Sequence, residues 1–228
     1  KRRKTEIEYH QSIGNLAIPK CTTLDDLLKE YVSLYGKSVW SMSVYSCNVA
    51  LIRNYISPML GDMKLNEITA RVLEKYYATL PTVEAVQSCT QKYRKYKEKN
   101  FVALPTIRKI HNLLRSAFSQ AMKWDLMERN PATLATVPKF EMQKREIWDA
   151  PTLFRAMEQC EDDRLKLCMN LSFACSLRMG EMLGLTWDCV DISEESIRDD
   201  KASIFINKEL QRANKAAFIA LEKKDVVA

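Results

Sequence analysis

An arginine and a glutamate three residues apart, Arg178 and Glu181, stand in an otherwise apolar stretch of the sequence. On a helix this spacing makes the two side chains neighbours, so the carboxylate can hold the guanidinium in place. A guanidinium stays charged at any working pH and can donate two parallel hydrogen bonds to one phosphate group. The pair therefore predicts a braced, phosphate-binding arginine, although an isolated pair of this kind is more often an ordinary surface salt bridge. The residues expected to bury most of this short helix are Met179, Met182, Leu183 and Leu185.

A basic segment upstream, residues 92–99, has the composition of a surface that binds a phosphate backbone. Its cations are interleaved with Tyr93 and Tyr96, and Glu98 is its single acid. Cations and aromatic rings together suit phosphates, sugars and bases. A lysine-rich solvated surface explains the segment about equally well. The candidates for DNA binding here are Lys92, Arg94 and Lys95.

The predicted helix that opens at Pro105-Thr106 is stronger evidence, because the face opposite its apolar stripe carries no acid. Charged groups on this face would bind phosphates, and its amide and hydroxyl groups would reach base edges. A helix that is merely soluble would usually include acids. The candidates on this face are Arg108, Lys109, Asn112, Arg115, Ser116, Gln120 and Lys123.

Two smaller groups complete the predicted DNA surface. The first turn of another helix offers hydroxyls and free backbone amides from Ser41, Ser43 and Tyr45, which suit phosphate. Helix capping alone explains the two serines about as well. The second group lies in a polar stretch that reads as a linker, and it consists of Lys139, Lys144 and Arg145.

Four amphipathic helices are predicted in the first part of the chain from helical periodicity and capping residues. They cover residues 22–36, 43–57, 69–81 and 105–123. Gly36, Ser57-Pro58 and Pro81 are expected to end the first three. Apolar stripes on four helices can bury a single bundle core.

The second part of the chain begins with two more predicted helices, 150–160 and 164–175, and then enters a sheet. The β-type run 203–206 is expected to pair with 217–221 across a turn near 213–214. The predicted organisation is a linker over 1–20, a first domain over 21–137, an interdomain linker over 138–148 and a partial second domain over 149–228.

Composition agrees with a folded, helical protein. The chain has 46% apolar and 28% charged residues, with only 5 glycines and 7 prolines. Its formal net charge of +6 permits nucleic acid as a partner. The seven cysteines lack Cys-x-x-Cys spacing and mostly fall in apolar helical stretches such as those of Cys168 and Cys175, which predicts buried, reduced thiols.

Other kinds of site are not predicted. The chain has two histidines, His10 and His111, neither at ligand spacing from a second donor, so we expect no metal, and no motif requires a cofactor. His111 is expected to be packed or to lie on the DNA side. The apolar run 167–177 is too short to span a membrane, and the basic N-terminus has no apolar signal core. We expect a soluble, cytoplasmic protein.

The ordered set of motifs resembles one family. Residues 177–187, Leu-Arg-Met-Gly-Glu-Met-Leu-Gly-Leu-Thr-Trp, followed by Asp-Cys-Val-Asp, resemble the first catalytic-arginine motif of the tyrosine recombinases, the integrases of phages and conjugative transposons. The segments similar to the core-binding domain of that family are 40–45, 55–62, 65–69, 106–118, 121–124 and 129–132.

The resemblance implies a mainly α fold: a four-helix SAM-like core-binding domain, then the helical start of an α+β catalytic domain with a few short strands. It implies cleavage and rejoining of duplex DNA through a 3′-phosphotyrosyl intermediate, without metal or ATP, by protomers that form a tetramer on DNA. In this account Arg178 is catalytic and Glu181 supports it.

The sequence departs from the family pattern in one respect. The family also uses a hairpin lysine, a His-x-x-Arg motif and a late tyrosine nucleophile, whereas this chain has no tyrosine after Tyr96. We therefore expect an inactive N-terminal fragment of an integrase. The alternatives are a non-catalytic accessory or regulatory DNA-binding protein on the same scaffold, and a helical protein-interaction module.

Overall fold

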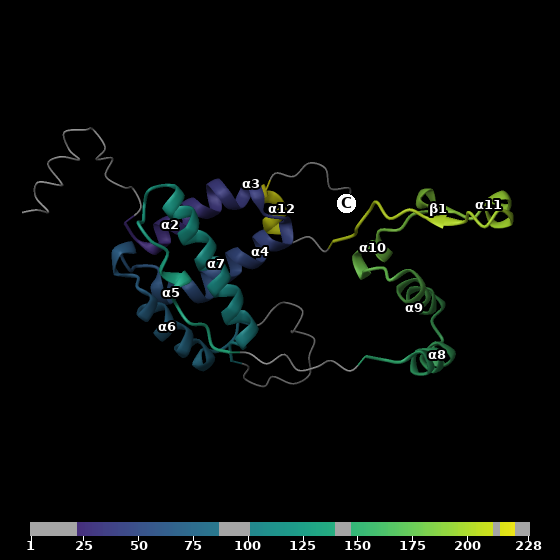
Figure 1. Ribbon diagram of the computed structural model, residues 1–228, viewed down its shortest axis with the longest axis horizontal. Helices are drawn as coiled ribbons and strands as arrows, with labels where there is room; N and C mark the ends of the chain where they lie inside the picture. The colour runs from purple at the N-terminus through teal and green to yellow at the C-terminus, as the bar shows by residue number, and fades with distance from the viewer. Residues whose placement is uncertain (1–21, 87–100, 140–146, 212–214, 222–228) are drawn as a thin grey trace, which may run out of the picture. The chain divides into compact units, whose positions relative to one another are not determined.

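The computed structural model describes residues 22–86, 101–139, 147–211 and 215–221. The chain divides into two compact units: unit 1 is Lys1–Glu141 with Asn214–Ala228, and unit 2 is Met142–Ala213. In Figure 1, unit 1 contains the helices from α2 to α7 and also α12, and unit 2 contains α8 to α11. The four predicted domain limits stay predictions.

Unit 1 is built from four helical stretches, as the sequence predicts. Two of them contain a π-helical segment, η1 or η2, between α-helical parts. The elements are α2 (Leu24–Glu30), η1 (Tyr31–Gly36), α3 (Lys37–Val39), α4 (Met42–Leu51), η2 (Ile52–Ile56), α5 (Ser57–Leu60), η3 (Leu65–Glu67), α6 (Ala70–Thr79), η4 (Leu80–Thr82), α7 (Leu104–Lys123), η6 (Pro131–Thr133) and α12 (Lys215–Leu221).

The predicted starts of two helices are confirmed by their capping contacts. Thr23 Oγ1 accepts a hydrogen bond from the Asp26 amide at 3.3 Å, while the Asp26 carboxylate accepts one from the Thr23 amide at 3.2 Å. Hydrogen bonding of its carboxylate to the Thr23 side chain, and then to the Thr23 amide, lowers the pKa of Asp26. Thr69 Oγ1 caps α6 by accepting from the Val72 amide at 3.3 Å. Each cap satisfies an amide that the helix itself leaves free.

Two predicted helix ends are wrong. The first helix continues past Gly36 to Val39, because Gly36 adopts ordinary helical angles (φ −61°) and makes room for a ring. A Cβ at Gly36 would lie 2.8 Å from the indole of Trp40. The second helix continues through Ser57-Pro58 to Leu60, because Pro58 falls in the first turn of α5, where its missing N–H is tolerated.

The core of unit 1 is closed and apolar. Helix α7 contributes the predicted stripe to it, and His111 is the one polar residue of this helix that is buried. Residues with side chains fully buried in the core include Leu27, Tyr31, Ile56, Tyr77, Ile110 and Phe118.

Unit 2 contains the two predicted helices, three short helical turns and one small sheet. Its elements are α8 (Ala150–Gln159), α9 (Asp163–Cys175), α10 (Met179–Leu183), η7 (Trp187–Cys189), β1 (Val190–Asp191), α11 (Glu194–Arg198) and β2 (Ser203–Ile204). The strands β1 and β2 pair antiparallel, with Val190 opposite Ile204. Among the described residues of this unit, only Leu177 and Cys189 are buried.

Three predictions about the second part of the chain are wrong. The partner of β2 is Val190–Asp191 rather than 217–221, because 215–221 forms the helix α12, which packs against α4 in unit 1. The apolar side chains of the Arg178 helix are not mostly buried, since Met179 is 72% exposed. The thiols are not generally buried: Cys47 and Cys175 are exposed, and Cys189 is the buried one among the described cysteines.

Candidate nucleic-acid interface and arginine site

Helix α7 presents one continuous polar face. The predicted residues Arg108, Lys109, Asn112, Arg115, Ser116 and Lys123 are all exposed on it, and Gln120 is half-buried at its edge. The whole helix contains no aspartate or glutamate. Within the described part of the chain, none of its four cations forms an ion pair. The face is therefore positively charged and available to an anionic partner.

A depression of about 250 Å³ separates this face from helix α4. Lys109, Asn112 and Ser116 line it from α7, and Cys47 and Asn48 line it from α4. Its inner wall is fixed, because Tyr31 Oη and Ser116 Oγ lie 2.7 Å apart in a hydrogen bond. The structure thus brings the polar groups of two helices around one shallow hollow.

The first turn of α4 is only partly as predicted. Ser41 is the N-cap, and its Oγ accepts from the Val44 amide at 3.5 Å while lying 3.3 Å from Ser43 Oγ. Capping is thus the observed contact of Ser41, and both hydroxyls remain exposed. Tyr45 is half-buried, and its ring packs at 6.2 Å from that of Trp40. Of the three candidates, Tyr45 has the clearest structural role.

A buried pair of polar groups supports α7 from behind. Tyr77 Oη lies 3.1 Å from His111 Nδ1. Burial, and then the nearby Arg115 and Arg108, lower the pKa of His111, while burial raises the pKa of Tyr77. Both shifts favour the neutral forms, and the direction of the hydrogen bond between them depends on the imidazole tautomer. The prediction that His111 is a packed residue is confirmed.

A loop anchor at the edge of the α7 face was not predicted. The side-chain amide of Asn130 donates to the Arg115 carbonyl and to Ser119 Oγ, both at 2.8 Å. Its carbonyl oxygen accepts from the Ala132 amide at 2.9 Å. These bonds fix residues 129–132 beside the helix. The sequence signal that could have revealed the anchor is Asn130-Pro131, a pair typical of turn initiation.

The predicted candidates in the basic segment and the linker are mostly not described. Lys92, Arg94, Lys95, Lys144 and Arg145 lie outside the described residues, and Lys139 is described and exposed.

In unit 2, Arg178 and Glu181 form the predicted pair. Arg178 is the N-cap of α10 rather than a residue within it. Its guanidinium lies 3.0 Å from Glu181 Oε1, and its amide donates to Glu181 Oε2 at 2.9 Å. The hydrogen bond from the Arg178 backbone amide, and then the Arg178 guanidinium, lower the pKa of Glu181. Both carboxylate oxygens are thereby used to hold Arg178, whose side chain is 86% exposed. Its remaining guanidinium N–H groups have no partner among the residues that the structure describes, so they can donate to another acceptor.

The segment after β2 lies against the Arg178 helix. The Leu210 amide donates to the Gly180 carbonyl at 2.8 Å, and a Cβ at Gly184 would lie 2.9 Å from the Leu210 nitrogen. Lys208 Nζ bonds to Asp188 and Thr186, which lowers the pKa of Asp188 to about 2. The close approach at Gly184 and this ion pair fix the helix that carries the arginine, and neither was predicted.

Two other kinds of feature are absent from the described residues. In the described ranges there is no cluster of histidine, cysteine or carboxylate side chains able to hold a metal ion. None of the helices that the structure describes is both long and apolar enough to cross a membrane.

The comparisons with known proteins concern first the helical bundle of unit 1. Residues 23–80 match the family model "Phage integrase, N-terminal SAM-like domain". This part of the chain is therefore similar to the phage-integrase SAM-like domain, and the curated proteins that resemble the chain are a tyrosine recombinase and an integrase.

Two curated relatives are similar over part of their length. A XerC-like tyrosine recombinase of Caldanaerobacter subterraneus is 26% identical over 64% of this chain and 35% of its own length. An integrase of Saccharopolyspora erythraea is 24% identical over 49% of this chain and 27% of its own length. The chain thus spans about a third of the length of the curated relatives that it matches.

Solved structures confirm the fold. The Tn1549 transposon integrase in complex with circular intermediate DNA matches with a TM-score of 0.58 and 14% identity, over 87% of this chain and 63% of that one. A lambda integrase dimer bound to a core site matches with a TM-score of 0.57 and 16% identity, over 75% of this chain and 56% of that one. The predicted mainly α fold, with a SAM-like domain followed by integrase-type elements, is confirmed.

Proposed function

We propose that this chain is the DNA-gripping part of a site-specific recombinase, with unit 1 binding duplex DNA through α7 and unit 2 supplying a phosphate-binding arginine. The observation that carries the proposal is the polar face of α7. This helix is twenty residues long, and its polar face has cations but no acids. Relatives that are integrases, including solved complexes with DNA, support the same partner.

The face of α7 has the groups that both parts of DNA recognition need. Arg108, Lys109, Arg115 and Lys123 provide charge for phosphates, and Asn112 provides an amide that can pair with a base edge. The hollow beside α4 places Lys109 and Asn112 at the rim of a concave surface. Phosphate contacts would set the position of the domain, and Asn112 would contribute to sequence preference.

This part of the proposal is tested by salt-dependent DNA binding of the 228-residue chain. Replacing Lys109 or Arg115 with alanine should weaken binding to a duplex and reduce the slope of log affinity against log salt by about one for each phosphate that is no longer neutralised. Lys37→Ala, which removes an exposed cation from a different helix of unit 1, is the matched control. An unchanged salt slope in both α7 variants would remove this face from the interface.

Arg178 is proposed to act on the scissile phosphate. In the reaction, a tyrosine hydroxyl attacks the phosphorus, the bond to the 5′ oxygen breaks, and a 3′-phosphotyrosyl link forms while a 5′-hydroxyl is released. A second 5′-hydroxyl later attacks that link and regenerates the tyrosine. Negative charge on the phosphoryl oxygens increases during both steps, and a guanidinium already held by Glu181 stabilises it without reorganising.

The attacking tyrosine is proposed to come from residues outside this sequence, so the chain alone is expected to be inactive. In a protein that carries this chain together with that tyrosine, Arg178→Ala should lower the rate of covalent adduct formation on a nicked substrate by about 10²–10³. DNA affinity should stay nearly unchanged, and Glu181→Gln should give a smaller loss. Normal adduct with Arg178→Ala would refute the assignment; DNA binding without adduct in the wild type would favour the accessory DNA-binding protein.

Assembly and location are further parts of the proposed function. The working assembly would contain several protomers on DNA, as in the lambda integrase tetramer bound to a Holliday junction, which this chain resembles with a TM-score of 0.57. The protein would act in the cytoplasm, at the nucleoid. Lys139, which is exposed, would add one more cation to the DNA-binding surface.

A further inference from the structure

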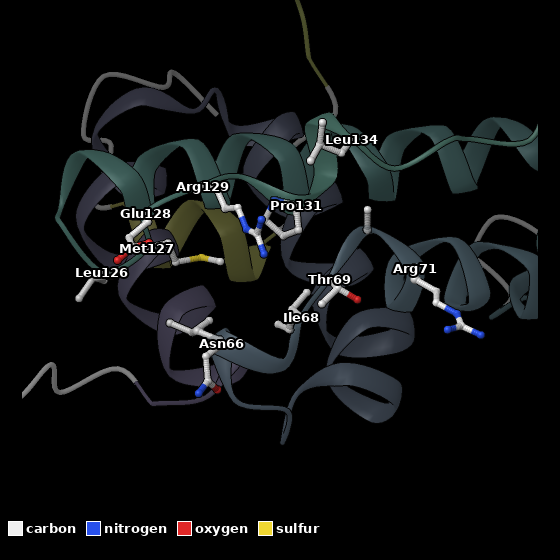
Figure 2. Close-up of a pocket in the computed structure, with 12 residues that line it drawn as sticks. Asn66, Ile68, Thr69, Arg71, Leu126, Met127, Glu128, Arg129, Pro131 and Leu134 are labelled. Carbon is white, nitrogen blue, oxygen red and sulfur yellow. The ribbon is translucent and has the colours of Figure 1, made fainter. Parts of the chain in front are cut away.

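A groove of about 680 Å³ lies on unit 1 (Figure 2). One wall is the segment 65–71, which leads into α6, and the other is the segment 126–134, which follows α7. None of the α7 candidates lines it. A concave volume of this size accommodates a few residues of a peptide.

Each wall of the groove carries one cation. Arg129 points into the groove from the 126–134 side in Figure 2, whereas Arg71 lies on the α6 side and its side chain points away from Arg129. Both are exposed, and neither forms an ion pair with any residue that the structure describes. Glu128 is the single acid of the lining. The groove therefore attracts an anionic group.

Several of the remaining residues of the lining are apolar, and Asn66 and Thr69 are its uncharged polar residues. Leu65 and Ile68 are buried, Leu126 and Met127 are half-buried, and Leu134 is 69% exposed at the edge. When a partner covers an exposed leucine beside a concave apolar surface, the free energy of binding becomes more favourable. The groove thus offers two guanidinium groups and an apolar surface to the same occupant.

We propose that this groove is a docking site for an acidic peptide segment of a protein partner, with one or two carboxylates on Arg71 and Arg129 and a large apolar side chain against Ile68, Met127 and Leu134. Arginine forks pair well with carboxylates, and a buried apolar anchor next to such pairs is the usual arrangement of a tight protein contact. DNA fits the lining less well, because its backbone would leave the leucines uncovered.

The position of the groove is rigid enough for a preformed site. Asn130 fixes one wall to α7 through the bonds to Arg115 and Ser119, and the Thr136 amide donates to Glu74 of α6 at 2.8 Å. Because both walls are held by the bundle, docking requires little ordering of this surface. The site is also independent of the proposed DNA function, since it uses none of its residues.

The test uses a displayed library of random twelve-residue peptides, selected against the 228-residue chain. Enriched sequences should combine aspartate or glutamate with leucine, phenylalanine or tryptophan. A fluorescein-labelled copy of the most enriched peptide should bind the Arg71→Glu/Arg129→Glu variant at least about tenfold more weakly than the wild type. Leu134→Ser should weaken binding severalfold, whereas Arg71→Lys/Arg129→Lys should retain most of it.

Three results would overturn the docking site. The first is that no peptide sequence is enriched. The second is that the enriched peptide binds the charge-reversed variant with the same affinity as the wild type. The third is a loss of duplex DNA affinity in Arg71→Ala/Arg129→Ala as large as that in Arg115→Ala, because the groove would then belong to the DNA surface. Circular dichroism of each variant verifies folding. If the chain does not bind DNA at all, the proposed function fails, but the peptide experiment still tests the docking site.

Discussion

Unit 1 and unit 2 both contain helices with apolar faces, yet among the described residues only those of unit 1 close a core. In unit 1 the faces of four helical stretches meet, and Leu24, Ile107 and Phe118 are fully buried. In unit 2, Phe173, Trp187 and Phe205 are each more than half exposed. Apolar periodicity determines which face of a helix must be buried, but that face is buried only where a second layer of structure packs on it.

The contrast also bears on the two candidate sites. The α7 face rests on a closed core, so its side chains are held in place by the fold of unit 1. Arg178 instead is held by local bonds to Glu181, through its guanidinium and its own amide. Local bracing therefore fixes the arginine within a unit that is otherwise open.

The largest expected effect comes from truncating the same residue type in each unit. Phe118→Ala should lower the free energy of unfolding by about 3–5 kcal/mol, because Phe118 is fully buried in the core. Phe173→Ala, which removes a 54% exposed ring stacked edge-on against Phe154, should cost no more than about 1.5 kcal/mol. Urea unfolding followed by circular dichroism measures both. Equal losses would show that the two units are equally closed.

A smaller effect is expected at Gly36. Alanine there would bring a Cβ to 2.8 Å from the Trp40 ring, which is itself packed against Tyr31 and Tyr45 and cannot move freely. Overpacking of this kind should lower the unfolding free energy by about 1–3 kcal/mol. Thermal denaturation measures it, with Lys37→Ala as the exposed neighbour that should stay within about 0.5 kcal/mol of the wild type. A neutral Gly36→Ala would mean that the first helix is less tightly packed than described.

The next effect is a pH dependence of unit 1. The pKa of His111 is lowered in the folded state, so the unfolded chain binds more protons below the ordinary pKa of 6.5. The stabilisation is complete above that pH and should be lost as pH falls toward the folded pKa. His111→Gln, which keeps a neutral side chain that can hydrogen-bond to Tyr77, should flatten the dependence between about pH 7 and 5. Retention of the full dependence in this variant would assign it to other groups.

The smallest effect is expected at the ion pair of unit 2. Lys208→Met should raise the pKa of Asp188 from about 2 toward its ordinary 3.8 and leave overall unfolding almost unchanged, because the pair is exposed. Carboxyl resonances followed by NMR through an acid titration measure the shift. Lys201→Met, which removes the partner of Asp199, should leave Asp188 as it is. An Asp188 pKa that does not respond would separate the segment 205–210 from the Arg178 helix.

Much of unit 1 could be predicted from the sequence, because its signals are local and agree with its packing. Thr23 and Thr69 cap helices where expected, and the stripe from Ile107 to Ala121 is buried as its spacing predicts. Gly36 and Pro58 do not end their helices as predicted. Glycine and proline tend to end helices, but the conformation at each position also depends on the neighbouring side chains. The ring of Trp40 needs a small residue at position 36, and the helix tolerates proline at the start of α5.

The candidate site was predictable as a set of residues rather than as a geometry. Spacing alone places Arg108, Asn112 and Arg115 on one face, and it pairs Arg178 with Glu181. It cannot show that Asn130 anchors a loop to that face or that Val190 pairs with Ile204, because these contacts join residues far apart in the chain. Nor can it show burial in unit 2, which depends on how many layers surround each helix.

The π-helical segments Tyr31–Gly36 and Ile52–Ile56 have a consequence for comparing this chain with others. A π turn closes its hydrogen bond one residue later than an α turn, so it behaves as a single inserted residue that rotates everything after it. A homologue that lacks one residue in either segment would keep the same bundle with an unbroken α-helix there. Alignments of this domain should therefore place one-residue gaps inside these two helices, in addition to the gaps in their connecting loops.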